Sequence, residues 1–167
     1  MIQVYTGNGK GKTTAALGLA LRAAGAGMKV YIGQFAKGRK SSELNSLKKI
    51  KKIKLEQFGR GCFVGKKPSS LDIKLANNGF KKVKEKTEAG VFDLIILDEV
   101  LGAVQTKMID IDKVLIFLKR YGGNTEIVLT GRSCPRAIIG LADLVSEIKE
   151  VKHYFRKGLR ARKGIEL

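Results

Sequence analysis

The stretch Tyr5-Thr6-Gly7-Asn8-Gly9-Lys10-Gly11-Lys12-Thr13-Thr14 stands between a short apolar segment, Ile2 to Tyr5, and an alanine-rich segment of helical composition. Its glycines let backbone N–H groups close around phosphate oxygens, its last lysine can reach the outer phosphates, and the following hydroxyl can bind Mg²⁺. We therefore predict a phosphate-binding loop. In the usual pattern, Gly-x-x-x-x-Gly-Lys-Thr, the first place would fall on Thr6, so this loop is a variant with its glycine one position later.

Length and composition fit a single cytoplasmic domain. The chain has 167 residues and a mass of 18.3 kDa, enough for one core, and we expect residues 1–167 to form one nucleotide-binding domain. Its two cysteines lack C-x-x-C spacing, which disfavours a zinc site or disulfide framework and fits a reducing cytosol. Met1 leads directly into the first apolar segment, and no apolar run approaches the ~20 residues of a membrane span, so we expect neither a signal peptide nor membrane contact.

The charge of the chain is extreme. The net charge is +18 and the pI is about 10.1, so the protein should attract polyanions. Most of the excess falls between Lys37 and Lys86, with lysines clustered over residues 48–54. Aromatic residues are not interleaved with these lysines, as a stacking platform for single strands requires, so nucleic acid is not an expected partner. A solvated lysine surface and a docking surface for an anionic partner both stay open.

Strand and helix patterns alternate along the chain. Apolar runs predict strands over residues 2–5, 29–35, 53–58, 91–99, 126–130 and 144–148. Helical spacing and capping residues predict helices over residues 12–24, 71–89, 100–105, 112–121 and 136–142, and a short one that Ser41 or Ser42 would cap. We expect the first two strands to form a parallel pair through a right-handed crossover, and the basic tail to close with a hairpin-like segment. The pattern predicts an α/β protein with a doubly wound, mostly parallel sheet.

Two carboxylates end the most apolar strand. Asp98 and Glu99 follow the run that starts at Val91, and ligands of open α/β sheets bind at the carboxyl ends of strands, so both should face the phosphate loop. A protein usually supplies a hydroxyl and a carboxylate as ligands to Mg²⁺, and water molecules supply most of the other ligands. With Lys12 and Thr13 of the loop, they predict a site for a nucleoside triphosphate with Mg²⁺ or Mn²⁺. Phosphoryl transfer, adenylyl transfer and attack on the ribose carbon all stay open.

Further cations and the histidine limit the chemistry. Arg132 follows the strand over residues 126–130 and is the best-placed second cation for phosphate oxygens. Arg22 lies among apolar residues of the first helix, where an arginine needs an anionic partner. His153 is the only histidine, and no serine or cysteine is visibly paired with it, which disfavours a hydrolytic triad and favours a structural role.

At these residues the sequence resembles the P-loop family of ATP:cob(I)alamin (corrinoid) adenosyltransferases. The matching segments are Thr6 to Ala16, Gln34-Phe35-Ala36-Lys37-Gly38, Leu97-Asp98-Glu99, Thr130-Gly131-Arg132, Ala142-Asp143-Leu144-Val145-Ser146-Glu147, and Val151-Lys152-His153 through Gly158 to Ile165. They follow the order of the family over nearly the whole chain. The loop variant together with the Gln-Phe and Lys-His segments makes the resemblance specific.

The resemblance implies a RecA-like P-loop NTPase fold, a three-layer sandwich, in a homodimeric enzyme. Such an enzyme moves the 5′-deoxyadenosyl group of ATP to the Co(I) of a reduced corrinoid, forms adenosylcobalamin or adenosylcobinamide, and releases inorganic triphosphate; a flavoprotein could supply the electrons. Co(I) is itself a strong nucleophile, so the protein needs no general base and has only to hold C5′ and stabilise the leaving triphosphate. ATP would lie reversed along the loop, with its terminal phosphate deepest.

The resemblance also implies roles for individual residues. Those that would bind ATP are Gly7, Asn8, Gly9, Lys10, Gly11, Lys12, Thr13, Thr14, Arg22 and Arg132. Those that would bind the metal are Thr13, Glu99 and Asp98. Lys12 and Glu99 would carry the catalysis.

Two features depart from the family pattern. Many relatives begin with an extra segment that helps to cover the corrinoid, whereas this sequence starts at its first strand, so we expect the corrinoid site to be closed differently. Many relatives also carry a phenylalanine and tryptophan pair that helps to displace the lower cobalt ligand, and this chain has no tryptophan. Phe63, in a glycine-rich segment, is the candidate residue for contact with the corrinoid.

Two other functions compete with the adenosyltransferase. A P-loop nucleoside kinase or RecA-like ATPase would release ADP, but it lacks an evident base beyond Asp98 or Glu99. A basic module that binds nucleic acid and uses ATP as a switch would show binding that weakens steeply with salt. The breadth of the matching segments favours the adenosyltransferase over both.

Overall fold

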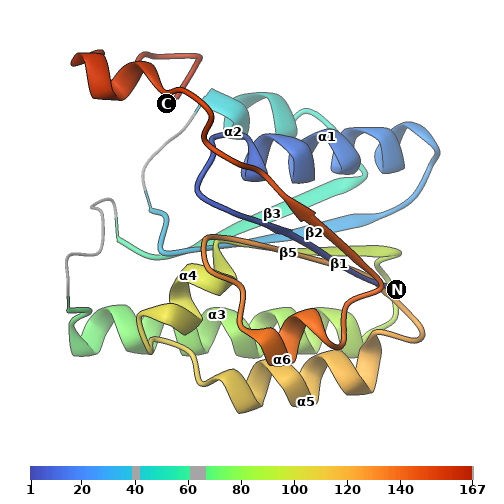
Figure 1. Cartoon of the computed structure of the whole chain (residues 1–167). Helices are drawn as coiled ribbons and strands as arrows, with labels where there is room; N and C mark the ends of the chain where they lie inside the picture. Colours follow the sequence, from blue (N-terminus) through green and yellow to red (C-terminus); the bar gives the residue numbers. More distant parts are fainter. Residues whose placement is uncertain (39–41, 61–66, 167) are drawn as a thin grey trace.

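The protein is built around a six-stranded sheet between two layers of helices (Figure 1). The computed structural model describes residues 1–38, 42–60 and 67–166. The strands are β1 (Ile2–Thr6), β2 (Val30–Phe35), β3 (Ile53–Phe58), β4 (Leu94–Asp98), β5 (Glu126–Thr130) and β6 (Leu144–Glu147). They lie in the order β3-β2-β4-β5-β1-β6, and every neighbouring pair is parallel. The predicted doubly wound, three-layer α/β fold of the P-loop, RecA-like type is confirmed.

Helices of different length cover the two faces of the sheet. They are α1 (Lys12–Gly25), α2 (Ser42–Leu47), α3 (Ser70–Glu88), α4 (Val100–Gln105), α5 (Ile111–Tyr121), α6 (Arg136–Ile139) and the 3₁₀ helix η1 (Tyr154–Lys157). Figure 1 shows α1 and α2 on one face and α3 to α6 on the other. No helix of the described residues is long and apolar enough to cross a membrane.

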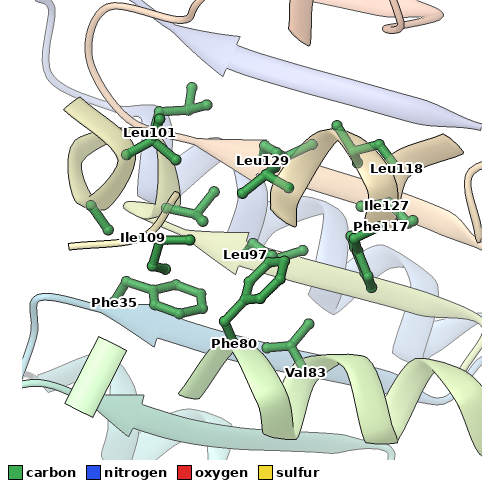
Figure 2. Close-up of a cluster of buried hydrophobic side chains, with 14 of the residues drawn as sticks. Phe35, Phe80, Val83, Leu97, Leu101, Ile109, Phe117, Leu118, Ile127 and Leu129 are labelled. Carbon is green, nitrogen blue, oxygen red and sulfur yellow. The ribbon is translucent and has the colours of Figure 1, made fainter. Parts of the chain in front are cut away.

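The two faces are packed differently. On the first face, α1 presents Ala16, Ala20 and Ala23 to the sheet, and these small side chains let the helix lie close to the strands. On the opposite face the core is built from large side chains, and Figure 2 shows Phe80 of α3 and Phe117 of α5 directed at Leu97, Ile127 and Leu129 of β4 and β5. Each such side chain stabilises the fold by about 1.5–3 kcal/mol when fully buried. The central strands are therefore fixed from both sides.

One prediction about strand pairing is wrong. β1 and β2 are parallel, but they do not pair, because β4 and β5 lie between them. α1 contacts β1, β5, β4 and β2, so the crossover from β1 to β2 lies over the two inserted strands. The most apolar strands, β4 and β5, thereby take the centre of the sheet, where neighbouring strands cover both of their edges.

The end of the chain also differs from its prediction. The hairpin-like segment expected near Lys157 is wrong: Tyr154–Lys157 form a 3₁₀ helix that ends at Gly158, and a turn closed by the N–H of Glu166 on the carbonyl of Arg162 follows. α6 is shorter than predicted, since Gly140 caps it after a single turn. Figure 1 shows this C-terminal segment on the α1 side of the sheet. Tyr154 and Glu166 hold the segment there, because both accept hydrogen bonds from Lys10 of the phosphate loop.

Candidate active site

The phosphate loop joins β1 to the first turn of α1. Gly11 is the N-cap of α1, with a φ of 122° that suits glycine, and no side chain caps the helix there. The first N–H groups of the helix therefore face the loop, an arrangement that favours anions. Lys12 is buried and donates to the carbonyl of Gly9 at 2.8 Å. Burial lowers the pKa of Lys12, and nearby Arg132 acts in the same direction.

Gly7 and Gly9 are required for a close approach that the motif does not reveal. A Cβ added at Gly7 would lie 2.4 Å from the carbonyl oxygen of Ile148, and one at Gly9 would lie 2.8 Å from the same atom. The N–H of Gly9 donates to that oxygen at 2.7 Å. The chain just after β6 thus packs against the side of the loop opposite the ligand. The N–H of Gly9 points to this chain and is not available to a ligand.

The carboxylate of Asp98 is the centre of the site. Its Oδ1 accepts from the hydroxyls of Thr13 at 2.8 Å and Thr130 at 2.7 Å. Its Oδ2 accepts from Gln34 Nε2 at 3.1 Å and from Lys37 Nζ at 2.7 Å. The prediction that Asp98 faces the phosphate loop is confirmed. Its side chain is almost fully buried, so these donors supply the stabilisation that water would otherwise provide.

Glu99 lies at the same edge in an unusual backbone conformation. It is the N-cap of α4 with a φ of 60°, a left-handed conformation that is uncommon for residues other than glycine. Its N–H donates to Thr130 Oγ1 at 2.9 Å, which ties it to β5. Burial, and then the neighbouring Asp98 carboxylate, raise the pKa of Glu99, while Lys37, Lys12 and Arg132 act in the opposite direction. These three cations therefore lie around one pair of carboxylates.

The other residues assigned to ATP are spread more widely. Arg132 follows β5. Its charge lowers the pKa of both Lys12 and Glu99, so it lies near these two residues. Arg22 is exposed on the third turn of α1, about 15 Å along the helix axis from Lys12, and its role in ATP binding stays a prediction. Asn8 and Thr14 are exposed at the loop. Phe63 lies outside the described residues.

Lys10 and the C-terminal segment meet above the loop. Lys10 Nζ donates to Tyr154 Oη at 2.7 Å and to Glu166 Oε1 at 2.8 Å. Tyr154 also donates to Glu166, whose carboxylate accepts from Arg162 as well. His153 caps η1, since its Nδ1 accepts from the N–H of Phe155 at 3.1 Å, and this structural role agrees with the prediction.

The donor set suits a divalent cation with hard oxygen ligands. Thr13, Asp98 and Glu99 supply one hydroxyl and two carboxylates at the mouth of the loop, and Mg²⁺ favours one or two carboxylates with the rest of its shell from water and phosphate. Lys37 Nζ already lies 2.7 Å from Asp98 Oδ2 and 3.2 Å from Thr13 Oγ1, so a positive charge is accommodated there. The residues present therefore fit such an ion.

Sequence reasoning assigned no role to three polar residues of this site. Gln34 is the next-to-last residue of β2 and lies beside Asp98 of β4, Lys37 follows β2, and Thr130 is the last residue of β5. A weak signal was available, because each stands at or just after the carboxyl end of a predicted strand. Their convergence depends on the order of the strands, and β2 and β5 are the two neighbours of β4.

Comparisons with known proteins agree with this geometry. The family model described as ATP:corrinoid adenosyltransferase BtuR/CobO/CobP matches residues 1–167. The corrinoid adenosyltransferase CobA of Salmonella typhimurium is 34% identical over 166 residues, which covers 99% of this chain and 85% of the relative. The corrinoid adenosyltransferase of Pseudomonas aeruginosa is 32% identical over 168 residues, which covers 99% and 83%.

Among solved structures, the flagellar accessory protein FlaH of Methanocaldococcus jannaschii superposes with a TM-score of 0.59. It is 17% identical and the match covers 87% of this chain and 69% of that chain, so this likeness concerns the fold alone. The family match, in contrast, spans the whole chain, and the curated relatives align over nearly all of it. The chain therefore belongs to the ATP:corrinoid adenosyltransferase family.

Proposed function

We propose that this protein transfers the 5′-deoxyadenosyl group of ATP to the Co(I) of a reduced corrinoid and releases inorganic triphosphate. Membership of the family supports the substrates. The observation that carries the proposal is the placement of Lys12 on the phosphate loop and of Lys37 at 2.7 Å from Asp98 Oδ2, with Arg132 close enough to lower the pKa of both Lys12 and Glu99. A site of this kind is built to hold and stabilise a polyanion.

The proposed reaction needs that stabilisation more than it needs a base. An electron pair of Co(I) forms the cobalt–carbon bond at C5′ while the C5′–oxygen bond breaks, and the triphosphate leaves with the electrons of that bond. No proton has to be removed, and the only histidine of the chain caps η1 instead of entering the site. Lys12, Arg132 and the N–H groups at the start of α1 would stabilise the leaving group.

The metal belongs to the proposal. Thr13, Asp98 and Glu99 would hold Mg²⁺, or Mn²⁺ in its place, and the ion would neutralise part of the charge on the triphosphate. Glu99 would act chiefly as a ligand, and the pKa that burial raises would fall once a divalent charge lies beside it. Binding of the metal should therefore favour the ionised carboxylate.

The assembly and location are also proposals. β6 is one of the two edge strands, and its Leu144 and Val145 are 44% and 41% exposed, which supports a homodimer that covers this edge. A flavoprotein would deliver the electrons that produce Co(I), and the strongly basic surface would suit an acidic partner of that kind. The enzyme would act in the cytoplasm.

A turnover assay tests the proposal. Purified protein with Mg²⁺, ATP and a chemically reduced corrinoid should give a light-sensitive cobalt–carbon product and one triphosphate per product. Lys12→Ala should bind ATP at least about tenfold more weakly, because a charged contact to phosphate is lost. Release of ADP and phosphate without a corrinoid product would overturn the proposal in favour of phosphoryl transfer.

A further inference from the structure

Lys37 occupies a position that the phosphate loop motif does not predict. Its ammonium lies 2.7 Å from Asp98 Oδ2 and 3.2 Å from Thr13 Oγ1, and so bridges two of the proposed ligands of the divalent ion. Thr13 directs its hydroxyl hydrogen to Asp98 Oδ1. The oxygen of this hydroxyl is therefore left with its lone pairs toward Lys37, and a metal bound to Thr13 would need the same oxygen.

The backbone places Lys37 in this position. Ala36, the residue before it, has a φ of 53°, and a left-handed conformation at a residue with a side chain costs energy that its surroundings must offset. The N–H of Ala36 donates to the carbonyl of Phe58 at 3.2 Å. Gly59 packs so closely that an added Cβ would lie 2.7 Å from the nitrogen of Lys37. The turn that aims Lys37 at Asp98 is thus held by β3.

Charge explains what the lysine does for the carboxylate. The side chain of Asp98 is 1% exposed, and an ionised carboxylate so deeply buried needs a nearby positive charge. Lys37 supplies it, and it is 31% exposed and can move out toward solvent. A divalent ion would neutralise the same carboxylate, but it would need Asp98 Oδ2 and Thr13 Oγ1, the two oxygens that Lys37 contacts.

We propose that Lys37 competes with the divalent ion, holding Asp98 and Thr13 in the metal-free protein and withdrawing when the ion binds. Two positive charges cannot share these oxygens without strong repulsion, so each metal ion that binds must displace the ammonium. The phosphates of ATP would offer the displaced ammonium new anionic partners. Divalent binding would thereby be weak without nucleotide and strong with it. This inference rests on the metal site of the proposed function.

The test measures metal affinity without any turnover. Mn²⁺ binding to the full chain is titrated by electron paramagnetic resonance in the absence of nucleotide, for the wild type and for Lys37→Met, which keeps the length and loses the charge. Because Mn²⁺ carries two charges, its repulsion from an ammonium about 4 Å away changes a binding constant by more than tenfold even at the dielectric of water, so the variant should bind Mn²⁺ at least about tenfold more tightly.

Two control variants make the result specific. Lys81→Met removes one charge from α3, where Lys81 is 78% exposed, and should leave Mn²⁺ affinity unchanged. Lys37→Arg keeps the charge and should keep the weak affinity of the wild type. A melting curve for each variant without metal, and again with Mn²⁺, checks that it folds, and the Lys37→Met protein should gain more from Mn²⁺ than the wild type does.

The outcomes separate this inference from the proposed function. If the wild type binds Mn²⁺ with ATP present, but Lys37→Met gains no affinity without ATP, the competition is overturned while the metal site stands. If neither protein binds Mn²⁺ with ATP, the metal site fails and the inference fails with it. Loss of corrinoid turnover in a protein that still shows the Mn²⁺ difference would count against the proposed reaction alone.

Discussion

At the scale of residues, Asp98 connects four segments, because its donors come from the start of α1, from β2 and the turn after it, and from β5. Asp98→Asn keeps an acceptor for the two threonine hydroxyls but places an NH₂ group against the donors of Gln34 and Lys37. Lys37 can turn toward solvent, but Gln34 is fully buried, and a donor buried without an acceptor costs about 1–3 kcal/mol, so we expect a loss of that order in the free energy of unfolding.

Urea denaturation of the metal-free protein measures this loss. Glu85→Gln is the matched control, because it also changes a carboxylate to an amide. Glu85 lies on α3, is 56% exposed, and forms a long ion pair of 4.0 Å with Lys81. It should shift the free energy of unfolding by no more than about 0.5 kcal/mol. An Asp98→Asn protein as stable as the control would show that Asp98 does not organise the four segments.

Cys134 offers a prediction about pH. It lies in the turn after β5, its N–H donates to Thr6 Oγ1 at 3.3 Å, and burial raises the pKa of its thiol to about 11. The thiolate is the reactive form, and at pH 8 only about one Cys134 thiol in a thousand would be ionised. In a Cys62→Ser background, a disulfide reagent should therefore modify the native protein about a hundredfold more slowly than the urea-unfolded chain.

The rate for Cys134 should rise with pH, because its raised pKa leaves it protonated until the pH approaches about 11. A series of rates between pH 7 and 10 should increase about tenfold per unit throughout, whereas the unfolded chain should begin to level off near its ordinary thiol pKa of 9.0. A native rate that levels off at the same pH as the unfolded rate would contradict the burial of this thiol.

At the scale of elements, the phosphate loop is packed against the chain that follows β6. Gly9→Ala would place a Cβ 2.8 Å from backbone atoms of Ile148 and Lys149, which cannot yield as a flexible side chain can. We expect the loop or the strand end to shift, with a loss of about 1–3 kcal/mol in the free energy of unfolding and weaker ATP binding. Denaturation and calorimetric titration with ATP measure the two effects.

Gly18 provides the control for that substitution. It lies in the middle of α1, and a Cβ added there meets no atom within 4 Å. Gly18→Ala should therefore stabilise the helix by about 0.5–1 kcal/mol, because alanine has the higher helix propensity, and should leave ATP affinity unchanged. If both alanine variants behaved alike, close packing at Gly9 would not be the reason for its glycine.

The elements also show how far sequence patterns reach. The apolar runs of β4 and β5 and the capping of α3 by Ser69 are local features, and these elements lie where they were predicted to within a few residues. The pairing of β2 with β4 is not local, and the wrong expectation that β2 pairs with β1 is why Gln34 and Lys37 received no role. The placement of Lys12, Thr13 and Asp98 at one edge of the sheet could be predicted because a loop motif and a strand end encode them directly.

At the scale of the whole molecule, the positive charge works against the compact state. The net charge is +18. The lysines on either side of β3 and along α3 have few acidic neighbours. One of these neighbours is Glu56, which contacts both Lys54 and Lys82. The lysines of both pairs are more than half exposed, so the pairs contribute little. Repulsion among the unpaired charges falls as salt screens it, with a screening length of about 30 Å at 0.01 M and 8 Å at 0.15 M.

Sodium chloride should therefore stabilise this protein, whereas it weakens proteins held by surface ion pairs. Between 0.01 and 0.15 M we expect a gain of about 1 kcal/mol in the free energy of unfolding, or about 2–4 °C in melting temperature for a chain of this size. Differential scanning calorimetry without nucleotide measures this gain.

A variant with Lys48, Lys49, Lys51 and Lys52 changed to glutamine should start from a higher melting temperature and gain less from salt, because it has fewer repulsions to screen. A melting temperature that falls as salt is added would mean that favourable ion pairs outweigh the repulsion.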